Sequence, residues 1–381
     1  MTSILIEGCR FIPNSFATVN QFQCLELMKR DGLKIFHKDV PYWNPAWKPG
    51  RNLLDVAAEE KLRSIPEPAP GQVCDAMLRM GVPFDFSPSA SKRTTVFATC
   101  EFGFVSAQAM SGDISLGDDP ESTVRIITPS LWSRNGLINT GANPKKISVV
   151  PHGIDPEIFH PLSPLERKAL RKKLGWEGKF VFLNISAMTS NKGIPALLKT
   201  LGTVVQSQAH VRLVLKGLDS WYNSDKHIEK LASHYSAKDM ALLRKHVAYI
   251  GGTLSFSEVA TYYQAADAYV APYSGEGFNL PVLEAIACGL PVICTRGGPT
   301  DDFTSDECSL AIRSELSRPQ NSQNTSEQLL VPDTAHLLEL MLQVIEDTAW
   351  VKRARQAGPE LALSTHTWKH VVDQLLPIVL G

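Results

Sequence analysis

The sequence predicts an α/β protein with two domains, each built on a parallel sheet covered by helices on both faces. Strand-like apolar runs alternate with helical patterns along most of the chain, and this alternation favours parallel sheets. The length of 381 residues suggests two domains, possibly three. A second series of alternating elements starts after residue 160, which is therefore the predicted boundary.

In the first series, the chain predicts one early helix and five strands. The helix is expected over residues 16–29. The strands are expected at 4–6, 35–37, 95–99, 125–128 and 147–150. The proline-rich piece that begins at Pro41, and the chain after it to about residue 75, is expected to be irregular.

In the second series, Ser163, Pro164 and Glu166 form a capping-box pattern that opens a basic helix ending at Gly175. The strands expected after this helix are 179–185, 211–216, 247–249, 267–271 and 291–295. Residues 319–325 are polar and are expected to form a surface loop.

Composition excludes several classes of protein. Apolar residues make up 44% of the chain, and a net charge of −1 gives no global attraction to nucleic acid or to an anionic membrane. No segment is long and apolar enough to span a bilayer, and the N-terminus has no signal-peptide pattern. The seven cysteines never form a CxxC pair, which indicates reduced thiols in a soluble, cytoplasmic protein.

The most informative segment runs from Ser274 to Ile293. It follows a short buried strand, and Asn279 is expected to cap a helix that runs to Cys288. Gly289 stands where a left-handed C-cap glycine belongs, and Pro291 prevents the helix from continuing.

Two carboxylates within that segment point to a ligand. Glu284 lies among apolar neighbours, where burial of a carboxylate is costly unless it has hydrogen-bonding partners. Glu276 is flanked by Gly275 and Gly277, which allow the backbone to approach a ligand closely. The free amides of a helix beginning at Asn279 suit a phosphate group. These features predict a sugar–phosphate pocket; the simpler interpretation, a helix cap with a partly exposed glutamate, leaves Glu284 unexplained.

Two lysines are candidate phosphate ligands. Lys192 follows the strand 179–185 by one loop and stands at the mouth of the next helix. Lys216 closes the strand 211–216, and open α/β sheets bind ligands at the carboxyl ends of their strands. A solvated surface lysine and an ordinary strand-end charge are the alternatives.

Other motifs are weak or absent. Residues 275–280 nearly spell the dinucleotide fingerprint GxGxxG, but the third glycine is missing and Glu276 would repel a pyrophosphate. Phosphate-loop, HExxH and clustered metal-ligand patterns are absent from the sequence, so no metal site and no cofactor are expected. His152 beside Gly153 is a candidate general base, although a turn residue is the more common role.

With these residues in place, the chain resembles the retaining GT-B glycosyltransferases, specifically glycosyltransferase family 4. The strongest likeness is the E-x7-E signature from Glu276 to Glu284. Further matches lie at 127–133, 147–155, 252–267 and 365–368. The resemblance covers residues 125–310 well and the first 120 poorly.

The resemblance implies two Rossmann-like domains facing a cleft. Residues 1–160, joined by a C-terminal helix at about 366–381, would form the acceptor domain, and residues 161–365 would bind the nucleotide sugar. Glu284 would bind the ribose hydroxyls and Glu276 the donor sugar, while Lys192 would neutralise the leaving diphosphate. The residues implied to contact the donor through their backbone are Gly277, Phe278, Asn279, Leu280 and Leu254.

Departures from the family pattern concern the charge near the phosphates. The family usually places an arginine about five residues before its lysine, where this chain has Ala187 or Ser186. We hypothesise that Lys216 supplies the missing charge. The usual glycine-rich loop after the first strand is replaced by residues 9–15, from which Arg10 or Ser15 could approach the phosphates.

The implied function is metal-independent, retaining transfer of a sugar from a UDP- or GDP-linked donor to a hydroxyl acceptor of unknown identity. Peripheral contact with a membrane is compatible with this function, and nucleic acid is not an expected partner. The alternatives are a catalytically silent GT-B protein that binds a nucleotide sugar or a partner, and a related GT-B phosphorylase or epimerase.

Overall fold

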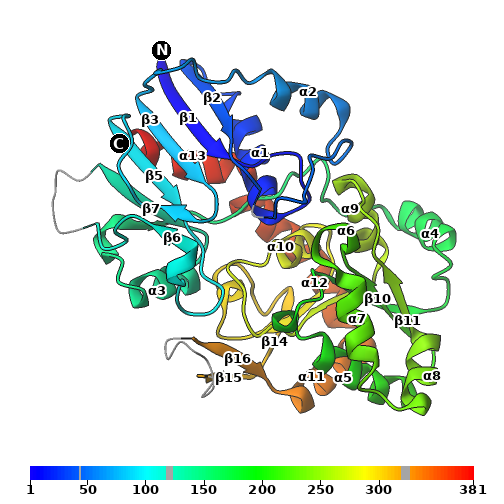
Figure 1. The fold of residues 1–381 in the computed structure, drawn as a ribbon. Helices are drawn as coiled ribbons and strands as arrows, with labels where there is room; N and C mark the ends of the chain where they lie inside the picture. The colour runs from blue at the N-terminus through cyan, green and yellow to red at the C-terminus, as the bar shows by residue number, and fades with distance from the viewer. Residues whose placement is uncertain (43, 117–122, 319–326) are drawn as a thin grey trace. The chain divides into compact units, whose positions relative to one another are not determined.

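A computed structural model describes residues 1–42, 44–116, 123–318 and 327–381 (Figure 1). The chain divides into two compact units. The first comprises residues 1–155, 318–328 and 366–381, and the second comprises 156–317 and 329–365. Each unit contains a six-stranded sheet in which all neighbouring strands are parallel.

The sheet of the first unit has the order β2-β1-β3-β5-β7-β8. These strands are Thr2–Gly8 (β1), Leu33–Asp39 (β2), Ala76–Met80 (β3), Arg93–Phe97 (β5), Val124–Thr128 (β7) and Ile147–Val149 (β8). The short strands β4 (Phe84–Asp85) and β6 (Met110–Ser111) pair separately. The helices are α1 (Ser15–Leu27), α2 (Val56–Ser64), α3 (Leu131–Asn139) and α13 (Trp368–Leu380), with 3-10 turns η1 (Ala107–Ala109) and η2 (Pro144–Lys146).

Helix α13 belongs to the first unit although it ends the chain. The ring of Trp368 stacks on Phe22 of α1, with centroids 5.6 Å apart. Arg30 forms an ion pair of 2.8 Å with Asp373 of α13. These contacts hold α13 against α1 and the turn that follows it, and the two helices cover the same face of the sheet (Figure 1).

The sheet of the second unit has the order β11-β10-β9-β12-β13-β14. These strands are Phe180–Ile185 (β9), Val211–Lys216 (β10), Val247–Ile250 (β11), Ala268–Ala271 (β12), Val292–Thr295 (β13) and Ser309–Ile312 (β14). A hairpin pairs β15 (Ser314–Ser317) with β16 (Leu329–Pro332). The helices are α4 (Pro164–Lys173), α5 (Ile194–Ser207), α6 (Asp219–Tyr222), α7 (Ser224–Ala232), α8 (Ala237–His246), α9 (Phe256–Ala265), α10 (Leu280–Ala287), α11 (Thr334–Glu346) and α12 (Thr348–Thr365), with 3-10 turns η3 (Ser190–Lys192) and η4 (Pro299–Asp302).

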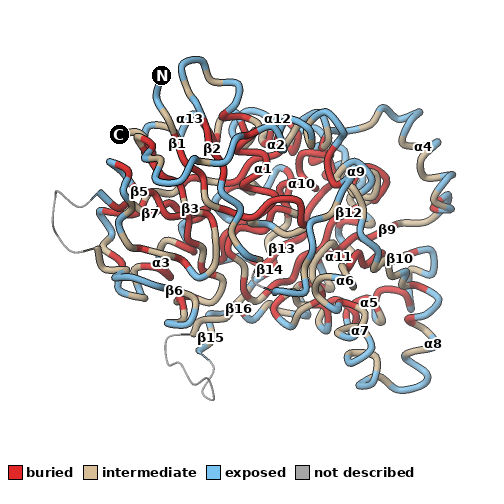
Figure 2. Tube along the Cα trace, turned by 45° about the horizontal axis from the view of Figure 1, so that its top comes forward, coloured by how far each residue is buried: buried red, intermediate tan, exposed pale blue. Residues whose placement is uncertain are grey.

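This sheet is buried on both faces, as its near-continuous apolar strands require (Figure 2). Helices α5, α8 and α11 pack on one face and share a core with the strands. Helices α9 and α10 pack against each other, and α10 also contacts β12, β13 and α12. The α/β class with covered parallel sheets, predicted from the alternation of elements, is therefore confirmed.

All ten predicted strands are present, with ends shifted by at most two residues. The capping box at Ser163 forms with both of its hydrogen bonds, and Gly175 lies just beyond α4 with φ +69°. Strands β3 and β14 of the two main sheets, and the short strands β4, β6, β15 and β16, were not predicted. Residues 319–325, predicted to be a loop, lie in the part of the chain that the structure does not describe.

The prediction that the chain is irregular to about residue 75 was wrong at α2. Asp55 caps this helix by accepting a hydrogen bond from the amide of Ala58. Glu59 and Arg63 form an ion pair one turn apart, and Leu62 is buried. One buried residue in nine leaves too little apolar periodicity to reveal a helix by pattern. Among the described residues, no helix combines the length and the apolar character needed to cross a bilayer.

Candidate functional site

The strand order of the second unit identifies where a ligand is expected. The chain runs outward from β9 through β10 to β11, then returns to add β12, β13 and β14 on the other side of β9. In open α/β sheets, ligands bind at the carboxyl ends of the strands where the order reverses. That point lies between β9 and β12, so the loops after these two strands form the candidate site.

These two loops carry Lys192 and Glu276, which form an ion pair. The ammonium Nζ of Lys192 lies 2.9 Å from Oε1 of Glu276. The two side chains are only 15% and 13% exposed, so the pair is partly shielded from water. Two residues singled out separately in the sequence, 84 positions apart, are thus brought into direct contact.

Hydrogen bonds and a close backbone approach hold the two loops together around this ion pair. The side-chain amide of Asn191 donates to the carbonyl of Gly275 at 2.8 Å. The backbone amide of Ser274 donates to the carbonyl of Asn191 at 2.8 Å. Gly193 has φ +71°, and a Cβ at this position would collide with the carbonyl oxygen of Pro272. The close approach of the two loops therefore requires glycine at position 193.

Both helices that begin at these loops lack a side-chain cap. Gly193 is the N-cap residue of α5 and Asn279 that of α10, and both have left-handed backbone conformations. By contrast, Ser163 and Ser255 cap α4 and α9 with complete capping boxes. The helix ends beside the Lys192–Glu276 pair thus keep first-turn amides that no side chain of the cap covers.

The prediction that the side chain of Asn279 caps α10 was wrong, although the helix does begin there. An N-cap side chain reaches the first turn from an extended backbone, whereas Asn279 has φ 77° and ψ 66°. Within the described residues, no acceptor bonds the backbone amides of Asn279 and Leu280. The same two amides were predicted to meet a donor, and in the structure they are available for that role.

Apolar packing fixes the rest of this turn. Phe278 is buried and its ring stacks on Phe303, with centroids 4.6 Å apart. Gly277 and Leu280 are buried as well. The backbone between Glu276 and α10 is therefore anchored by its side chains, which leaves its amides as the groups that can face a ligand.

Glu284 lies one turn into α10 and accepts a hydrogen bond from the phenol of Tyr263 at 2.8 Å. Among the residues that the structure describes, Tyr263 is the one hydrogen-bond partner of this carboxylate, and no cation pairs with it. Burial raises the pKa of Glu284 to about 7, and the Tyr263 hydrogen bond opposes that shift. A half-buried carboxylate with unused acceptor capacity is suited to bind hydroxyl groups.

Lys216 lies at the carboxyl end of β10, in register with Ile185 at the end of β9. Its side chain is 4% exposed, and its ammonium donates to the carbonyl of Gly217. Burial lowers the pKa of Lys216 to about 8, while nearby Asp219 opposes the shift. Lys216 therefore occupies the predicted edge of the sheet but does not touch Lys192 or Glu276.

The remaining predicted residues are spread over both units. Leu254 lies in the second unit, in the loop directly before α9, the helix that carries Tyr263. Ser15 lies in the first unit, exposed at the first position of α1. Arg10 is buried and donates two hydrogen bonds of 2.9 and 2.8 Å to Asp39. Its guanidinium is therefore engaged within the first unit.

The first unit has a cavity of its own, of about 450 Å³, near the carboxyl ends of β1 and β2. Its lining includes Arg10, Phe11, Asp39, Tyr42 and Arg63. His152 does not line it. The His152 ring packs between Phe97 and Trp368, and burial lowers its pKa to about 3. These surroundings favour the packing role over the role of general base.

Comparison with known proteins identifies the part of the chain that carries this site. The family model described as "Glycosyl transferases group 1" matches residues 166–318. The matched segment is similar to this family. It contains Lys192, Lys216, Glu276 and Glu284, and it lies almost entirely within the second unit.

Curated relatives are similar over a larger share of the chain than the family model matches. Mannosylfructose-phosphate synthase of Agrobacterium fabrum is 24% identical over 63% of this chain and 49% of its own length. A D-inositol 3-phosphate glycosyltransferase of Nocardiopsis dassonvillei is 25% identical over 71% of this chain and 62% of its own. The chain thus spans about half to three fifths of the length of these two relatives.

Solved structures extend the likeness to the whole chain and show its fold. HepE of Anabaena, determined with UDP and glucose, superposes with a TM-score of 0.68 at 14% identity, over 99% of both chains. Sucrose-phosphate synthase of Thermosynechococcus elongatus gives 0.66 at 16% identity, over 99% of this chain and 98% of the other. The fold is that of the GT-B glycosyltransferases, with two Rossmann-like domains.

Three residues that shape the site were not predicted from the sequence. Asn191 and Gly193 allow the close approach of the two loops, and Tyr263 donates a hydrogen bond to Glu284. Gly193 had a usable signal, because a glycine directly before a helix with proline near its start favours an unusual N-cap. Asn191 and Tyr263 act on partners 84 and 21 positions away, and no local pattern reveals such contacts.

Proposed function

We propose that this protein is a retaining glycosyltransferase that moves a sugar from a UDP- or GDP-linked donor to a hydroxyl acceptor without a metal ion. The observation that carries the proposal is the Lys192–Glu276 ion pair at the point where the strand order reverses, within the group 1 glycosyltransferase domain. Lys192, the amides at the start of α10, and Glu284 are the groups that such a donor needs.

In this proposal, Lys192 and the helix amides stabilise the leaving diphosphate. Negative charge grows on the diphosphate as its bond to the sugar breaks, and preorganised donors aimed at that charge lower the barrier most directly. The pairing with Glu276 keeps the Lys192 ammonium at the mouth of α5 before the donor arrives. Glu276 is then placed to accept hydrogen bonds from sugar hydroxyls.

Glu284 binds the ribose hydroxyls, and the backbone near Leu254 lies against the base. A ribose offers two neighbouring hydroxyls as donors, and the Glu284 carboxylate has acceptor capacity beyond its bond to Tyr263. Lys216 adds positive charge that the family's arginine provides in other members and that Ala187 lacks here. The acceptor binds in the first unit, and it attacks from the face that the diphosphate leaves, so that the diphosphate oxygen accepts its proton.

The test is a panel of UDP- and GDP-linked sugars, screened by calorimetry for binding and by product release for slow hydrolysis without an acceptor. One donor is expected to bind and to be hydrolysed slowly, and E276Q should abolish hydrolysis. The proposal fails if none of the donors binds, or if the E276Q variant hydrolyses the bound donor at the wild-type rate.

A catalytically silent nucleotide-sugar-binding protein is the second candidate, and Ala187 is the observation that favours it. Without an arginine there, the loop after β9 lacks a charge that the family usually has, and part of the charge of Lys192 is balanced by Glu276. Binding of a donor with no hydrolysis, and no transfer to any member of an acceptor panel, would support this candidate over the enzyme.

A further inference from the structure

A second cavity in the second unit lies at the opposite edge of the sheet from the Lys192–Glu276 pair. It has a volume of about 690 Å³, within the range of roughly 300–1,000 Å³ found for small-molecule sites. Its walls come from α4, the C-terminal end of α10, and α12. Asp267, directly before β12, lies beneath it and bonds the amide of Val181 at the start of β9. The cavity is therefore at the amino-terminal edge of the strands.

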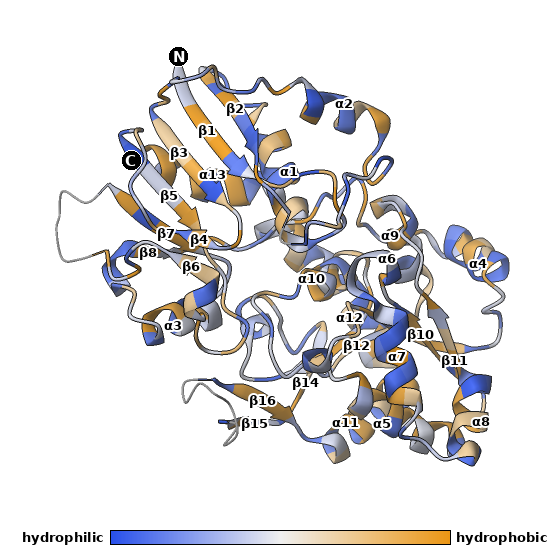
Figure 3. Cartoon of the chain, in the orientation of Figure 1, coloured by the Kyte–Doolittle hydropathy of each residue, from blue (hydrophilic) through white to orange (hydrophobic). Residues whose placement is uncertain are grey.

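The lining of this cavity is strongly basic, although the whole chain is nearly neutral. The basic residues that line it are Arg167, Lys168, Arg171, Lys352 and Arg355. Two carboxylates oppose them, Glu177 on the lining and Asp267 beneath the arginines. This leaves an excess of three positive charges around one hollow. Three of the five come from α4, a helix that is largely hydrophilic and has no buried residue (Figure 3).

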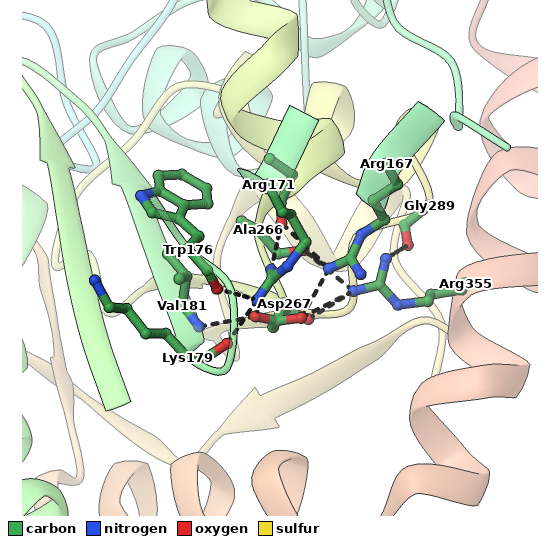
Figure 4. Close-up of polar contacts among 10 residues, drawn as sticks. Arg167, Arg171, Trp176, Lys179, Val181, Ala266, Asp267, Gly289 and Arg355 are labelled. Atoms are coloured by element: carbon green, nitrogen blue, oxygen red, sulfur yellow. Dashed lines mark hydrogen bonds and ion pairs between the residues drawn. The ribbon is translucent and has the colours of Figure 1, made fainter. Parts of the chain in front are cut away.

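Part of this charge has a structural role at Asp267 (Figure 4). Arg167 and Arg171 bond separate oxygens of Asp267 at 2.7 and 2.9 Å. Arg171 also donates to the carbonyls of Trp176 and Lys179, so all of its terminal nitrogens are used. Arg355 approaches the same carboxylate at 3.8 Å and donates to the carbonyl of Ala266. One carboxylate thus balances one of three guanidinium groups.

The remaining charge has no protein partner among the described residues. Nε of Arg167 is buried without a hydrogen bond, and its Nη1 makes none either. The ammonium groups of Lys168 and Lys352 form no ion pair or hydrogen bond. Burial, and then the neighbouring charge of Arg167, lowers the pKa of Arg355 to about 10. Such crowding of like charges is unfavourable unless an anion shares the space.

We propose that this cavity binds a phosphate-bearing ligand, with Lys168, Lys352 and the terminal nitrogen Nη1 of Arg167 as its anchors. Guanidinium and ammonium groups that converge on one hollow match the several oxygens of a phosphate or a pyrophosphate. The site is separate from the donor site proposed above, because the two lie at opposite edges of the same parallel sheet.

The test compares two double variants by calorimetry with inorganic pyrophosphate. K168A/K352A removes two anchors, and K172A/K173A removes two exposed lysines of the same helix that do not line the cavity. Each comparison is made in wild-type and in K192A backgrounds, because pyrophosphate can also occupy the donor site. We expect K168A/K352A to weaken binding at least tenfold in both backgrounds and K172A/K173A to change it less than twofold.

A parallel arm identifies the source of the phosphate. Vesicles of phosphatidylcholine with and without phosphatidic acid are pelleted with each variant. Retention only on phosphatidic acid, lost in K168A/K352A, assigns the site to a lipid headgroup, whereas pyrophosphate binding without retention assigns it to a soluble ligand. The proposal is overturned if neither probe binds in the K192A background, or if the two double variants lose binding equally. Neither outcome affects the proposed glycosyltransferase activity, which donor hydrolysis tests.

Discussion

The phenol of Tyr263 on α9 donates a hydrogen bond of 2.8 Å to the carboxylate of Glu284 on α10. Tyr263 is fully buried, so this bond connects the interior of the domain with a carboxylate that retains some exposure. A tyrosine donor favours the charged form of Glu284, and burial favours the neutral form more strongly. The balance places the titration of Glu284 at about neutral pH, where donor binding can report it.

We therefore expect donor affinity to rise with pH through about 7. Ribose hydroxyls donate to a carboxylate, so the charged form of Glu284 binds the donor and the neutral form does not. A nucleotide sugar is the right probe, because its diphosphate stays fully ionised in this range. In E284Q, affinity should fall by 10- to 100-fold and lose this pH dependence, as expected for a lost hydrogen bond to a charged group. An E284Q variant with the wild-type slope would exclude Glu284 as the ribose ligand.

Tyr263→Phe supplies the matched control for that experiment. Removal of the phenol withdraws the group that lowers the pKa of Glu284, so the midpoint of the affinity curve should move to higher pH. Stability without ligand gives an independent check. Because the folded-state pKa lies above the usual 4.5, stability should fall as pH rises from 4.5 through about 7, and E284Q should lack this fall.

Lys192→Ala should reduce the rate of donor hydrolysis by about 10²- to 10³-fold, the usual cost of losing one preorganised charge-stabilising group. The fold should persist, since Lys192 is partly exposed and its ion-pair partner is the other site residue. Lys199→Ala is the control, because Lys199 is an exposed lysine of helix α5, which begins two residues after Lys192. Initial rates at saturating donor measure the effect. Equal rates in the two variants would remove Lys192 from the mechanism.

The sequence predicted the strands and α10 well, because apolar runs, a capping box and helix-ending glycines are local signals. It also selected Lys192 and Glu276 individually. What it could not provide is their contact, since the ion pair depends on the closure of two loops 84 residues apart. The Asn279 prediction failed for a related reason. Asparagine is a common side-chain cap, so the sequence favours that role. In the structure, the loop that Asn191 bonds at Gly275 ends at Asn279 in a left-handed backbone conformation, from which the side chain does not cap the helix.

Lys216 provides a second pH test, with opposite signs for affinity and stability. If it supplies the charge that Ala187 lacks, donor affinity should fall as pH rises through about 8, where the buried ammonium loses its proton. Stability without ligand should rise between about 8 and 10.5, because the unfolded chain then binds the proton that the folded protein has lost. Lys216→Ala should lose the affinity change, and Lys216→Arg should remain charged and retain affinity above pH 8. A K216A variant with unaltered donor turnover would contradict the hypothesis.

Chelation of metal ions should leave activity unchanged. Lys192 and the uncovered amides of α10 supply the positive charge that a divalent ion provides in metal-dependent transferases. Hydrolysis of the best donor is compared before and after dialysis against EDTA, and then with added Mg²⁺ or Mn²⁺. A loss of activity that one of these ions restores would show that metal independence is wrong.

Gly193→Ala should destabilise the protein and reduce donor affinity, although no side chain is removed. The new Cβ would collide with the carbonyl oxygen of Pro272, and φ of +71° is unfavourable for alanine. The loops after β9 and β12 must then separate, which breaks the Lys192–Glu276 contact.

Gly202→Ala is the matched control on the same helix α5. It meets no atom within 4 Å and should stabilise the protein by about 0.5–1 kcal/mol, because alanine is the better helix former. Denaturant unfolding and donor calorimetry on both variants test this directly, and a Gly193→Ala variant that behaves like Gly202→Ala would mean that the two loops do not need their close approach.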